Sequence, residues 1–316
     1  MNPTGPLSLS ALGSFTIGGR RVQVDGQPTR VVAISRDLPE YLVDPNGTYR
    51  IEHAYVQYFL PAEQRRLPVV LVHGGGLTGS CWETTPDGRD GWLQHFLRDG
   101  RPVYVVDNVE RGRAGWCPLP GMANEERPIL RTEEEAWEIF RIGPPDGYAK
   151  LDPFAGCLFP VEHLSELSRQ QVPRWTTTTS LSVVAIAALA AKVGPCVVIA
   201  HSQGGGIAAQ AAAERSTDIA ALVLLEPHGL PAQSDRLPTM PQLIVAGDFI
   251  DLSPPYQSLR RRWLEYLDAA ADGGIIHEYF DLPAMGHPGN SHMIMMDSNS
   301  EGVASLVGEW IDEVAS

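Results

Sequence analysis

Hydrophobic and polar positions alternate along the first sixty residues of the chain. Residues 14–24 (SFTIGGRRVQV) hold two short alternating runs around two glycines, which favours a hairpin that turns at Gly18 and Gly19. Residues 48–61 (TYRIEHAYVQYFLP) alternate over a longer stretch, as is typical of an antiparallel strand with one face in water. We therefore expect an antiparallel edge in this part of the fold.

The pattern changes after Pro68, where short apolar runs rich in β-branched residues alternate with helical stretches. The runs cover residues 69–76, 102–109, 196–202, 219–227, 242–250 and 275–283, and the helical stretches cover 90–99, 180–192, 204–215, 255–272 and 301–314. Apolar strands that alternate with helices are typical of a parallel sheet covered on both faces. The predicted fold class is α/β, with a mostly parallel central sheet, helices on both faces and antiparallel N-terminal strands.

Residues 112–175 interrupt this rhythm with a segment rich in proline, glycine and aromatic residues. We interpret the segment as a cap inserted over the strand ends, within a single domain that spans residues 1–316. Such a cap would bury its aromatic side chains and line an apolar pocket. Trp116, Phe154 and Phe159 are the aromatic residues that we expect there.

A candidate nucleophile lies in Ala200-His201-Ser202-Gln203-Gly204. This small-x-Ser-x-Gly pattern is weak alone, but here it follows an apolar strand and opens an alanine-rich helix, which is the context that a nucleophile elbow requires. The small residues on either side of the serine let strand and helix approach, and the helix N-terminus favours developing negative charge. We expect Ser202 to be the nucleophile, with His201 beside it in the pocket.

The glycine-rich loop at residues 73–79 (HGGGLTG) follows the first parallel strand. A tetrahedral intermediate needs two preorganised N–H donors for its oxyanion, and loops in this position commonly provide one of them. We assign the donors to Gly75 and Gln203, with Gly76 as the alternative to Gly75, and expect Gly76 and Leu77 to line the pocket. A phosphate-binding P-loop is excluded because no Gly-Lys-Ser/Thr follows.

The order Ser, acid, His along the chain predicts a base near the C-terminus. His287 and His292 both lie there, and spacing does not separate them. Three carboxylates at strand ends are candidates for the acid, namely Glu226, Asp248 and Asp251. Each could orient a histidine ring and stabilise its protonated form.

The composition narrows the range of partners. A formal net charge of −14 disfavours nucleic acid and membrane surfaces. The longest apolar run, residues 183–191, is too short to cross a bilayer. The N-terminus lacks the pattern of a secretory signal, so we expect a cytoplasmic protein, with a periplasmic or secreted location as the alternative.

The four cysteines show no spacing of a metal site, and we expect neither metal nor organic cofactor. The sequence permits a disulfide among Cys81, Cys117 and Cys157. We expect Cys196, which opens an apolar strand, to be a buried apolar residue. Few lysines or arginines lie near the predicted site, which favours a moderately bulky, uncharged substrate.

The motifs together resemble the α/β-hydrolases, and specifically the bacterial serine esterases known as esterase 713-like. The likeness extends over about residues 45–316 and rests on the segments HGGGLTGSCWETTPDGRDGW (73–92), RGRAGW (111–116), AWEIFRIGPPD (136–146), FPVEHLSEL (159–167), VPRW (172–175), AHSQGG (200–205), LEPHG (225–229) and GNSHMIMMDSN (289–299). The resemblance implies that Glu226 is the acid and His292 the base. The group has adjacent cysteines where this chain has Gly75 and Gly76, so a vicinal disulfide is excluded.

These observations predict a serine hydrolase that cleaves small-molecule carboxylic esters through an acyl-enzyme. The same triad could act on a lactone, an amide or a C–C bond, or serve a lyase or isomerase, and a binding protein on a hydrolase scaffold is the rival outside enzymology. We also expect a homodimer, because exposed strand edges are commonly paired and the related group is dimeric.

Overall fold

The computed structural model describes residues 5–117, 119, 127–215, 217–232 and 236–315. In this part of the chain, eight strands form one sheet and two short strands form another. The order across the main sheet is β1 (Leu9–Val24), β4 (Gly47–Pro61), β6 (Val103–Asp107), β5 (Val69–Val72), β7 (Cys196–His201), β8 (Ile219–Leu225), β9 (Gln242–Ala246) and β10 (His277–Asp281). The small sheet pairs β2 (Arg30–Val32) with β3 (Tyr41–Val43).

The sheet is parallel from β6 to β10 and antiparallel at its N-terminal edge. β1 pairs with β4, and β4 pairs with β6, in antiparallel register. The apolar runs predicted after Pro68 all form strands, β5 to β10, and the alternating stretch at 48–61 forms β4. The predicted fold class, with an antiparallel edge on a parallel sheet, is therefore confirmed.

The predicted turn at Gly18 and Gly19 is wrong. β1 continues through both glycines and stays paired with β4. Both glycines have positive φ, and Glu52 on the facing strand has φ 63°, so the two strands bend at the same level. A Cβ at Gly19 would lie 2.6 Å from the carbonyl oxygen of Ile51. The glycines therefore permit a bend in a continuous strand rather than a reversal of the chain.

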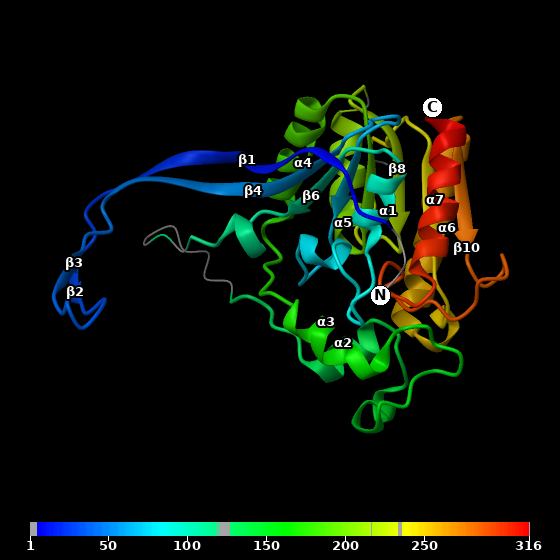
Figure 1. Ribbon diagram of the computed structural model, residues 1–316, viewed down its shortest axis with the longest axis horizontal. Helices are drawn as coiled ribbons and strands as arrows, with labels where there is room; N and C mark the ends of the chain where they lie inside the picture. The colour runs from blue at the N-terminus through cyan, green and yellow to red at the C-terminus, as the bar shows by residue number, and fades with distance from the viewer. Residues whose placement is uncertain (1–4, 118, 120–126, 216, 233–235, 316) are drawn as a thin grey trace.

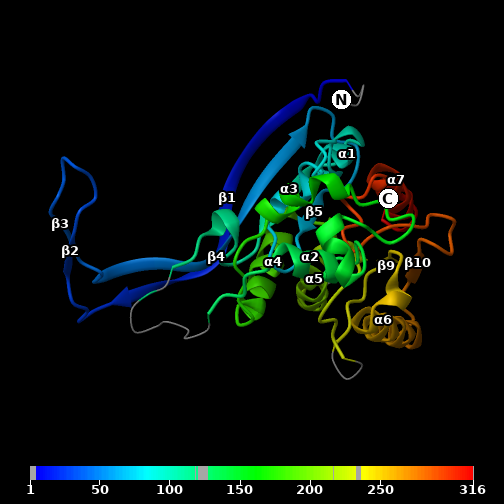
Figure 2. The ribbon, with the colours of Figure 1, turned by 90° about the horizontal axis from the view of Figure 1, so that it is seen from below.

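Beyond this bend the paired strands form an arm, defined here as residues 20–51. Figure 1 shows the far part of β1 and β4 extending away from the rest of the molecule, with β2 and β3 at its end, and Figure 2 shows the same projection after a 90° turn. Arg20 and Glu52 form an ion pair across the strands where the arm begins. The arm thus projects beyond the other strands, since β6 pairs with β4 only at residues 55–59.

Helices cover both faces of the sheet, and each face has its own core. Alternate residues such as Leu71 and Val70 point to opposite faces and belong to different apolar clusters. On one face pack α1 (Trp92–Arg98) and α7 (Ser300–Val314), and on the other α4 (Thr179–Val193), α5 (Gln203–Glu214) and α6 (Pro254–Asp272). These are the five helices that the sequence predicts. No helix in the described residues is long and apolar enough to cross a membrane.

The insertion at 112–175 contains short helices that the sequence analysis did not specify. In Figure 1 its helices lie at one end of the sheet, and in Figure 2, which is seen from that end, they lie in front of β5 and α5. The elements are η2 (Gly112–Ala114), α2 (Glu133–Ile139), η3 (Pro145–Lys150), η4 (Val161–His163) and α3 (Leu164–Arg169). Outside the insertion, η1 (Gly79–Trp82) and η5 (Ile250–Leu252) complete the helices. Residues 118 and 120–126 of the predicted cap lie outside the described part of the chain.

The close contact between α5 and the loop after β8 depends on a glycine. Gly206 donates a backbone hydrogen bond to His228 O at 3.0 Å. A Cβ at this position would lie 2.4 Å from the carbonyl oxygens of both His228 and Gly229. Neither oxygen belongs to a flexible side chain, so the helix or the loop would have to move.

We expect Gly206→Ala to lower the free energy of unfolding by about 1–3 kcal/mol through this overlap. Gly308→Ala is the matched control, because Gly308 lies inside α7 and a Cβ added there would meet no atom within 4 Å beyond its chain neighbours and the helix's own backbone. That change should instead raise stability by about 0.5–1 kcal/mol. Urea unfolding measures both, and a Gly206→Ala protein as stable as the wild type would contradict the overlap.

Candidate active site

Ser202 lies at the turn between β7 and α5. Its backbone angles are φ 53° and ψ −122°, a conformation that residues other than glycine rarely adopt. Gly204 lets the helix approach the neighbouring strand, because a Cβ there would lie 2.5 Å from His73 O. Strand, strained serine and glycine-rich helix thus have the arrangement of a nucleophile elbow.

The loop after β5 passes beside this turn and is held by His73. The ring Nδ1 donates to Gly74 O at 2.7 Å, and Nε2 accepts from the backbone N–H of Asn108 at 3.0 Å. Burial lowers the pKa of His73 to about 4, so the ring is neutral at pH 7 and can accept this bond. The neutral ring therefore fixes the start of the loop that carries Gly75.

The ring of His292 is buried among aromatic side chains from three parts of the chain. Its centroid lies 5.9 Å from that of Phe140, 5.1 Å from Tyr256 and 4.5 Å from His201. Its backbone N–H donates to Phe140 O at 2.8 Å, and His201 Nε2 donates to His292 O at 2.9 Å. Burial lowers the pKa of His292, although its bond to Glu226 opposes the shift, so the ring is neutral at pH 7.

Glu226 follows β8 and is completely buried. His292 Nδ1 donates to its Oε2 at 2.6 Å, and the backbone N–H of Gly247 donates to its Oε1 at 2.7 Å. The guanidinium of Arg141 binds both carboxylate oxygens, with Nη1 2.7 Å from Oε2. Burial alone would raise the pKa of Glu226, but Arg141 and then His292 hold it well below its usual range.

Arg141 comes from the insertion and is itself buried. Its guanidinium lies 4.1 Å from the centroid of the Tyr256 ring, and its Nε donates to Asp248 O at 2.9 Å. The guanidinium thus contacts Glu226, Asp248 and Tyr256 at once. The residue lies within the segment AWEIFRIGPPD that carried the resemblance, yet the sequence analysis gave it no role.

The other candidates for acid and base lie elsewhere. Asp248 accepts from the backbone N–H groups of Phe249 and Gly289, and Asp251 is exposed and pairs with Arg260. His287 is exposed. The pair that the resemblance implied, Glu226 and His292, is the pair that is hydrogen-bonded.

Ser202 and His292 face a common cavity of about 230 Å³. Its lining is Gly75, Leu77, Arg131, Ile139, Phe140, Arg174, Thr179, His201, Ser202, Gln203, Gly206, Ile207, Gln210, His228, Gly229, Tyr256 and His292. Both predicted oxyanion donors, Gly75 and Gln203, are therefore at the same cavity as the serine. The insertion contributes four of the lining residues, namely Arg131, Ile139, Phe140 and Arg174.

Two of the predicted pocket residues line this cavity and four do not. Leu77 and His201 belong to the lining. The prediction needs correction for the other four, none of which belongs to the lining of the cavity. Gly76 lies next to a lining residue, and Trp116 is 52% exposed and packs on Trp175. Phe154 stacks on Phe249, and Phe159 is buried in the core. Phe154 and Phe159 thus pack the insertion against the rest of the fold, and Trp116 packs within the insertion.

Comparisons with known proteins identify the family of the chain. The model of the alpha/beta hydrolase family matches residues 69–291. The chain belongs to the alpha/beta hydrolase family. A solved structure of a novel bacterial esterase superposes with a TM-score of 0.87 at 35% identity, covering 100% of this chain and 99% of that one. A probable secreted lipase, phiG of Fungal sp. (strain ATCC 74256), is 25% identical over 84% of this chain and 88% of its own.

Several side chains around the site of this hydrolase escaped the sequence analysis. His228 and Tyr256 line the cavity, and burial lowers the pKa of His228 to about 3, so three neutral imidazoles surround the serine. Arg131 and Arg174 also line it, which removes the reason for expecting an uncharged substrate. Both arginines lie in the insertion, whose path over the site could not be read from residue spacing.

No group of three or more histidine, cysteine, aspartate or glutamate side chains that could hold a metal ion occurs in the described residues. The four cysteines are free thiols. Cys117 is exposed, Cys157 is half-buried, and Cys81 and Cys196 are buried. Burial raises the pKa of Cys196 to about 12, as expected for an apolar core residue.

Replacing Arg141 with Met would leave the Glu226 carboxylate buried without its cation. We expect the free energy of unfolding at pH 7 to fall by about 3–5 kcal/mol, as measured by urea unfolding. Arg169→Met is the control, because Arg169 pairs with Glu166 on the surface with 73% of its side chain exposed, and its loss should be much smaller.

The difference in the free energy of unfolding between wild type and Arg141→Met should also depend on pH. The lowered pKa of Glu226 stabilises the fold above the usual glutamate pKa of about 4.3, and this contribution disappears as the pH falls through the lowered value. The difference between wild type and Arg141→Met should therefore narrow in acid. A difference that stays constant down to low pH would contradict the role of the ion pair.

Proposed function

We propose that this alpha/beta hydrolase cleaves small-molecule carboxylic esters through an acyl-enzyme on Ser202. The esterase and lipase relatives support carboxylic ester hydrolysis. The observation that carries the mechanism is the hydrogen bond of 2.6 Å between His292 Nδ1 and Glu226 Oε2, at a cavity that the ring shares with Ser202. This is the constellation of a serine, histidine and acid triad.

In the first step, Ser202 Oγ forms a bond to the carbonyl carbon of the ester. Its proton passes to Nε2 of His292, which is free because Nδ1–H is bound to Glu226. Glu226 stabilises the imidazolium that results. The carbonyl oxygen becomes an oxyanion and accepts hydrogen bonds from the backbone N–H groups of Gly75 and Gln203. Gln203 is the first residue of α5, so the helix dipole also favours the negative charge.

The tetrahedral intermediate then collapses. The C–O bond to the alcohol breaks, and His292 Nε2–H returns its proton to the leaving oxygen. Water attacks the acyl-enzyme in the second half of the cycle, with His292 again taking a proton. The acid product leaves and Ser202 regains its hydrogen, so atoms and charge balance without a cofactor.

We keep the cytoplasmic location as a prediction. The fungal relative is named a secreted lipase, which fits the alternative of a periplasmic or secreted protein. The partner implied by the proposed chemistry is a small ester, and we propose neither a nucleic acid nor a membrane as a partner.

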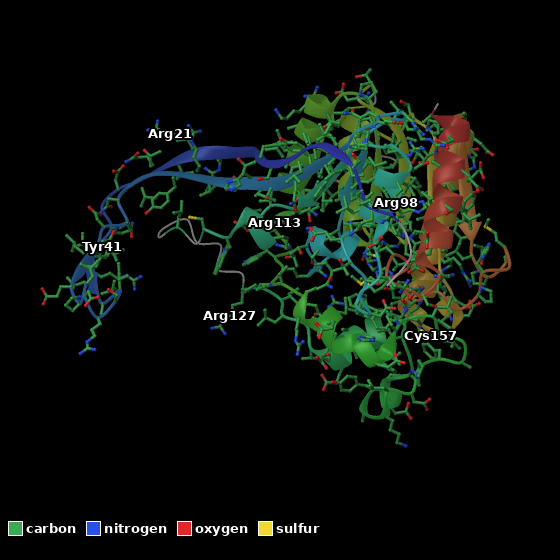
Figure 3. All side chains as sticks on the ribbon, in the orientation of Figure 1. Arg21, Tyr41, Arg98, Arg113, Arg127 and Cys157 are labelled. Atoms are coloured by element: carbon green, nitrogen blue, oxygen red, sulfur yellow. The ribbon has the colours of Figure 1, made fainter. Side chains whose placement is uncertain are left out.

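We propose in addition that the protein forms a homodimer through the arm. Five large apolar side chains near the arm's end are at least 43% exposed, namely Val31, Ile34, Leu38, Tyr41 and Leu42. Figure 3 labels Tyr41 at this end, far from the insertion around Cys157. An exposed apolar patch on projecting strands favours association, and two-fold dimers are the commonest soluble oligomers.

The triad predicts a strong loss of turnover in two variants. Ser202→Ala should lower kcat for a responsive ester by several powers of ten because the nucleophile is gone. Glu226→Gln should lower it by about 10³–10⁴-fold because the amide favours the wrong tautomer of His292. Ester hydrolysis followed at pH 7 measures both, with circular dichroism to establish that each variant is folded.

The controls distinguish this triad from its rivals. Asp251→Asn should keep nearly full activity, since Asp251 is exposed and pairs with Arg260. A collapse of activity in Asp248→Asn or Asp251→Asn, with Glu226→Gln active, would overturn the choice of acid. A fluorophosphonate probe should label wild-type Ser202 and fail on Ser202→Ala, and a wild type that resists labelling would favour a binding protein.

The dimer predicts a specific effect of charge at the arm's end. The double variant Val31→Lys and Leu42→Lys replaces two side chains that are 62% and 60% exposed, and it should convert the dimer to a monomer. Light scattering at micromolar concentration measures the mass. Leu252→Lys, at a residue equally exposed on η5, should leave the dimer intact. A wild-type mass near 34.4 kDa would refute the dimer.

A further inference from the structure

Two arginines line the cavity of Ser202, and no acidic side chain does so in the described residues. Arg131 leaves only 8% of its side chain exposed. Its guanidinium lies 5.2 Å from the centroid of Phe140, whose ring stacks on His292. The cavity of this acidic protein is therefore cationic on its own walls.

The backbone explains why both arginines reach the same wall. Ile129 and Arg174 form an antiparallel bridge, with Ile129 N–H donating to Arg174 O at 2.8 Å and Arg174 N–H donating to Ile129 O at 3.1 Å. The side chains of Ile129 and Arg174, which face each other in this bridge, point to the same side of the two segments. In extended backbone the side chain two positions along points to that side too, and here it is Arg131. Arg131 and Arg174 are consequently placed together by two segments that are distant in sequence.

Among the residues that the structure describes, the two guanidinium groups have a single acidic partner between them. Arg131 has one acidic neighbour, Glu135, at 3.8 Å, and 47% of that side chain is exposed. Arg174 has no ion pair or side-chain hydrogen bond to any described residue, and its Nε is buried without a partner. Burial lowers the pKa of Arg131, and the charge of Arg174 adds to that effect. A guanidinium whose polar atoms are buried normally has an anionic partner, and no described side chain supplies one to the half-buried Arg174.

Arg174 lies directly against the proposed oxyanion loop. A Cβ at Gly75 would lie 2.9 Å from Arg174 Nη1 and 3.1 Å from its Cζ. The guanidinium and the side-chain oxygen of Gln203, which would lie 2.7 Å from the same Cβ, thus fill the space that the missing side chain leaves. An anion bound to Arg174 would be only a few atoms from an ester carbonyl held by Gly75 and Gln203.

We propose that Arg131 and Arg174 bind a carboxylate of the substrate, so that the enzyme prefers small esters that carry a carboxylate close to the scissile bond. The inference rests on the proposed ester hydrolysis and names its substrate class. A guanidinium fork matches a planar carboxylate with two parallel hydrogen bonds. The cavity of about 230 Å³ suits a short molecule, and the neutral imidazoles add no competing charge.

Two matched pairs of esters test the preference. Monoethyl succinate and ethyl succinamate differ only by carboxylate and amide on the acyl side, and 3-acetoxypropanoate and 3-acetoxypropanamide make the same comparison on the alcohol side. We expect kcat/KM to favour the carboxylate by about 10- to 100-fold in at least one pair. Arg174→Gln and Arg131→Gln should each remove most of that preference, because each lowers kcat/KM for the carboxylate substrate much more than for the amide substrate.

Arg169→Gln is the control, because it removes a guanidinium from the same insertion at a side chain that is 73% exposed. It should keep the preference. Equal rates within both pairs would overturn the inference while leaving ester hydrolysis intact. A variant that slows carboxylate and amide equally would also overturn it, since the arginines would then act on the oxyanion.

A binding measurement separates this inference from the proposed function. The Ser202→Ala protein lacks the nucleophile, so calorimetry can compare monoethyl succinate with ethyl succinamate without turnover. Tighter binding of the carboxylate, lost when Arg174→Gln is added, supports the site even if no ester is hydrolysed. Equal binding of the two overturns it even if hydrolysis is established, and thermal unfolding shows whether each variant is folded.

Discussion

The buried pairing of Glu226 with Arg141 is the interaction on which the site depends. A carboxylate that is completely buried at the end of β8 would protonate without a cation beside it. Arg141 keeps it charged, and the charged Glu226 in turn holds His292 Nδ1. Because Arg141 comes from the insertion, that segment does more than cover the site. It supplies the charge that lets the central sheet carry a buried acid.

Phe140, the residue before Arg141, links the same segment to the proposed base. Its carbonyl accepts from the backbone N–H of His292, and its ring stacks on the imidazole. His201 holds the carbonyl of His292 from the other side. Two neighbouring residues of the insertion and one beside Ser202 thus hold His292 and Glu226 in place, which is the preorganisation that the proposed triad needs.

The charge of the whole molecule and the charge of its cavity have opposite signs. A net charge of −14 repels anions at long range, but salt screens that field over about 8 Å at physiological ionic strength. Inside the cavity, Arg131 and Arg174 act at contact distance and with little screening. The proposed carboxylate specificity therefore depends on two side chains rather than on the net charge. The sequence analysis expected an uncharged substrate because few lysines or arginines lie near the site motifs along the chain.

The periodicity of the chain was enough to predict the parallel sheet and its covering helices. Apolar runs and helical stretches are local signals, and β5 to β10 and the five main helices follow them. The elbow at Ser202 was equally readable, since strand, serine and glycines are adjacent in sequence. Gly18 and Gly19 were misread, because a paired glycine in a strand and a glycine in a turn have the same local composition. Only the pairing with β4 distinguishes a bend from a reversal.

What the sequence determined by itself was the architecture and the position of the serine, because both arise from neighbours along the chain. Local spacing left open which acid faces which histidine, and the resemblance alone favoured Glu226 with His292. The tertiary structure decided that contact, since it joins the end of β8 to a loop 66 residues later. It also brought Arg141 to Glu226, and Arg131 and Arg174 to the wall of the cavity. The insertion has no periodic pattern, and only the folded chain pairs Arg141 with Glu226 and places Arg131 and Arg174 at the cavity.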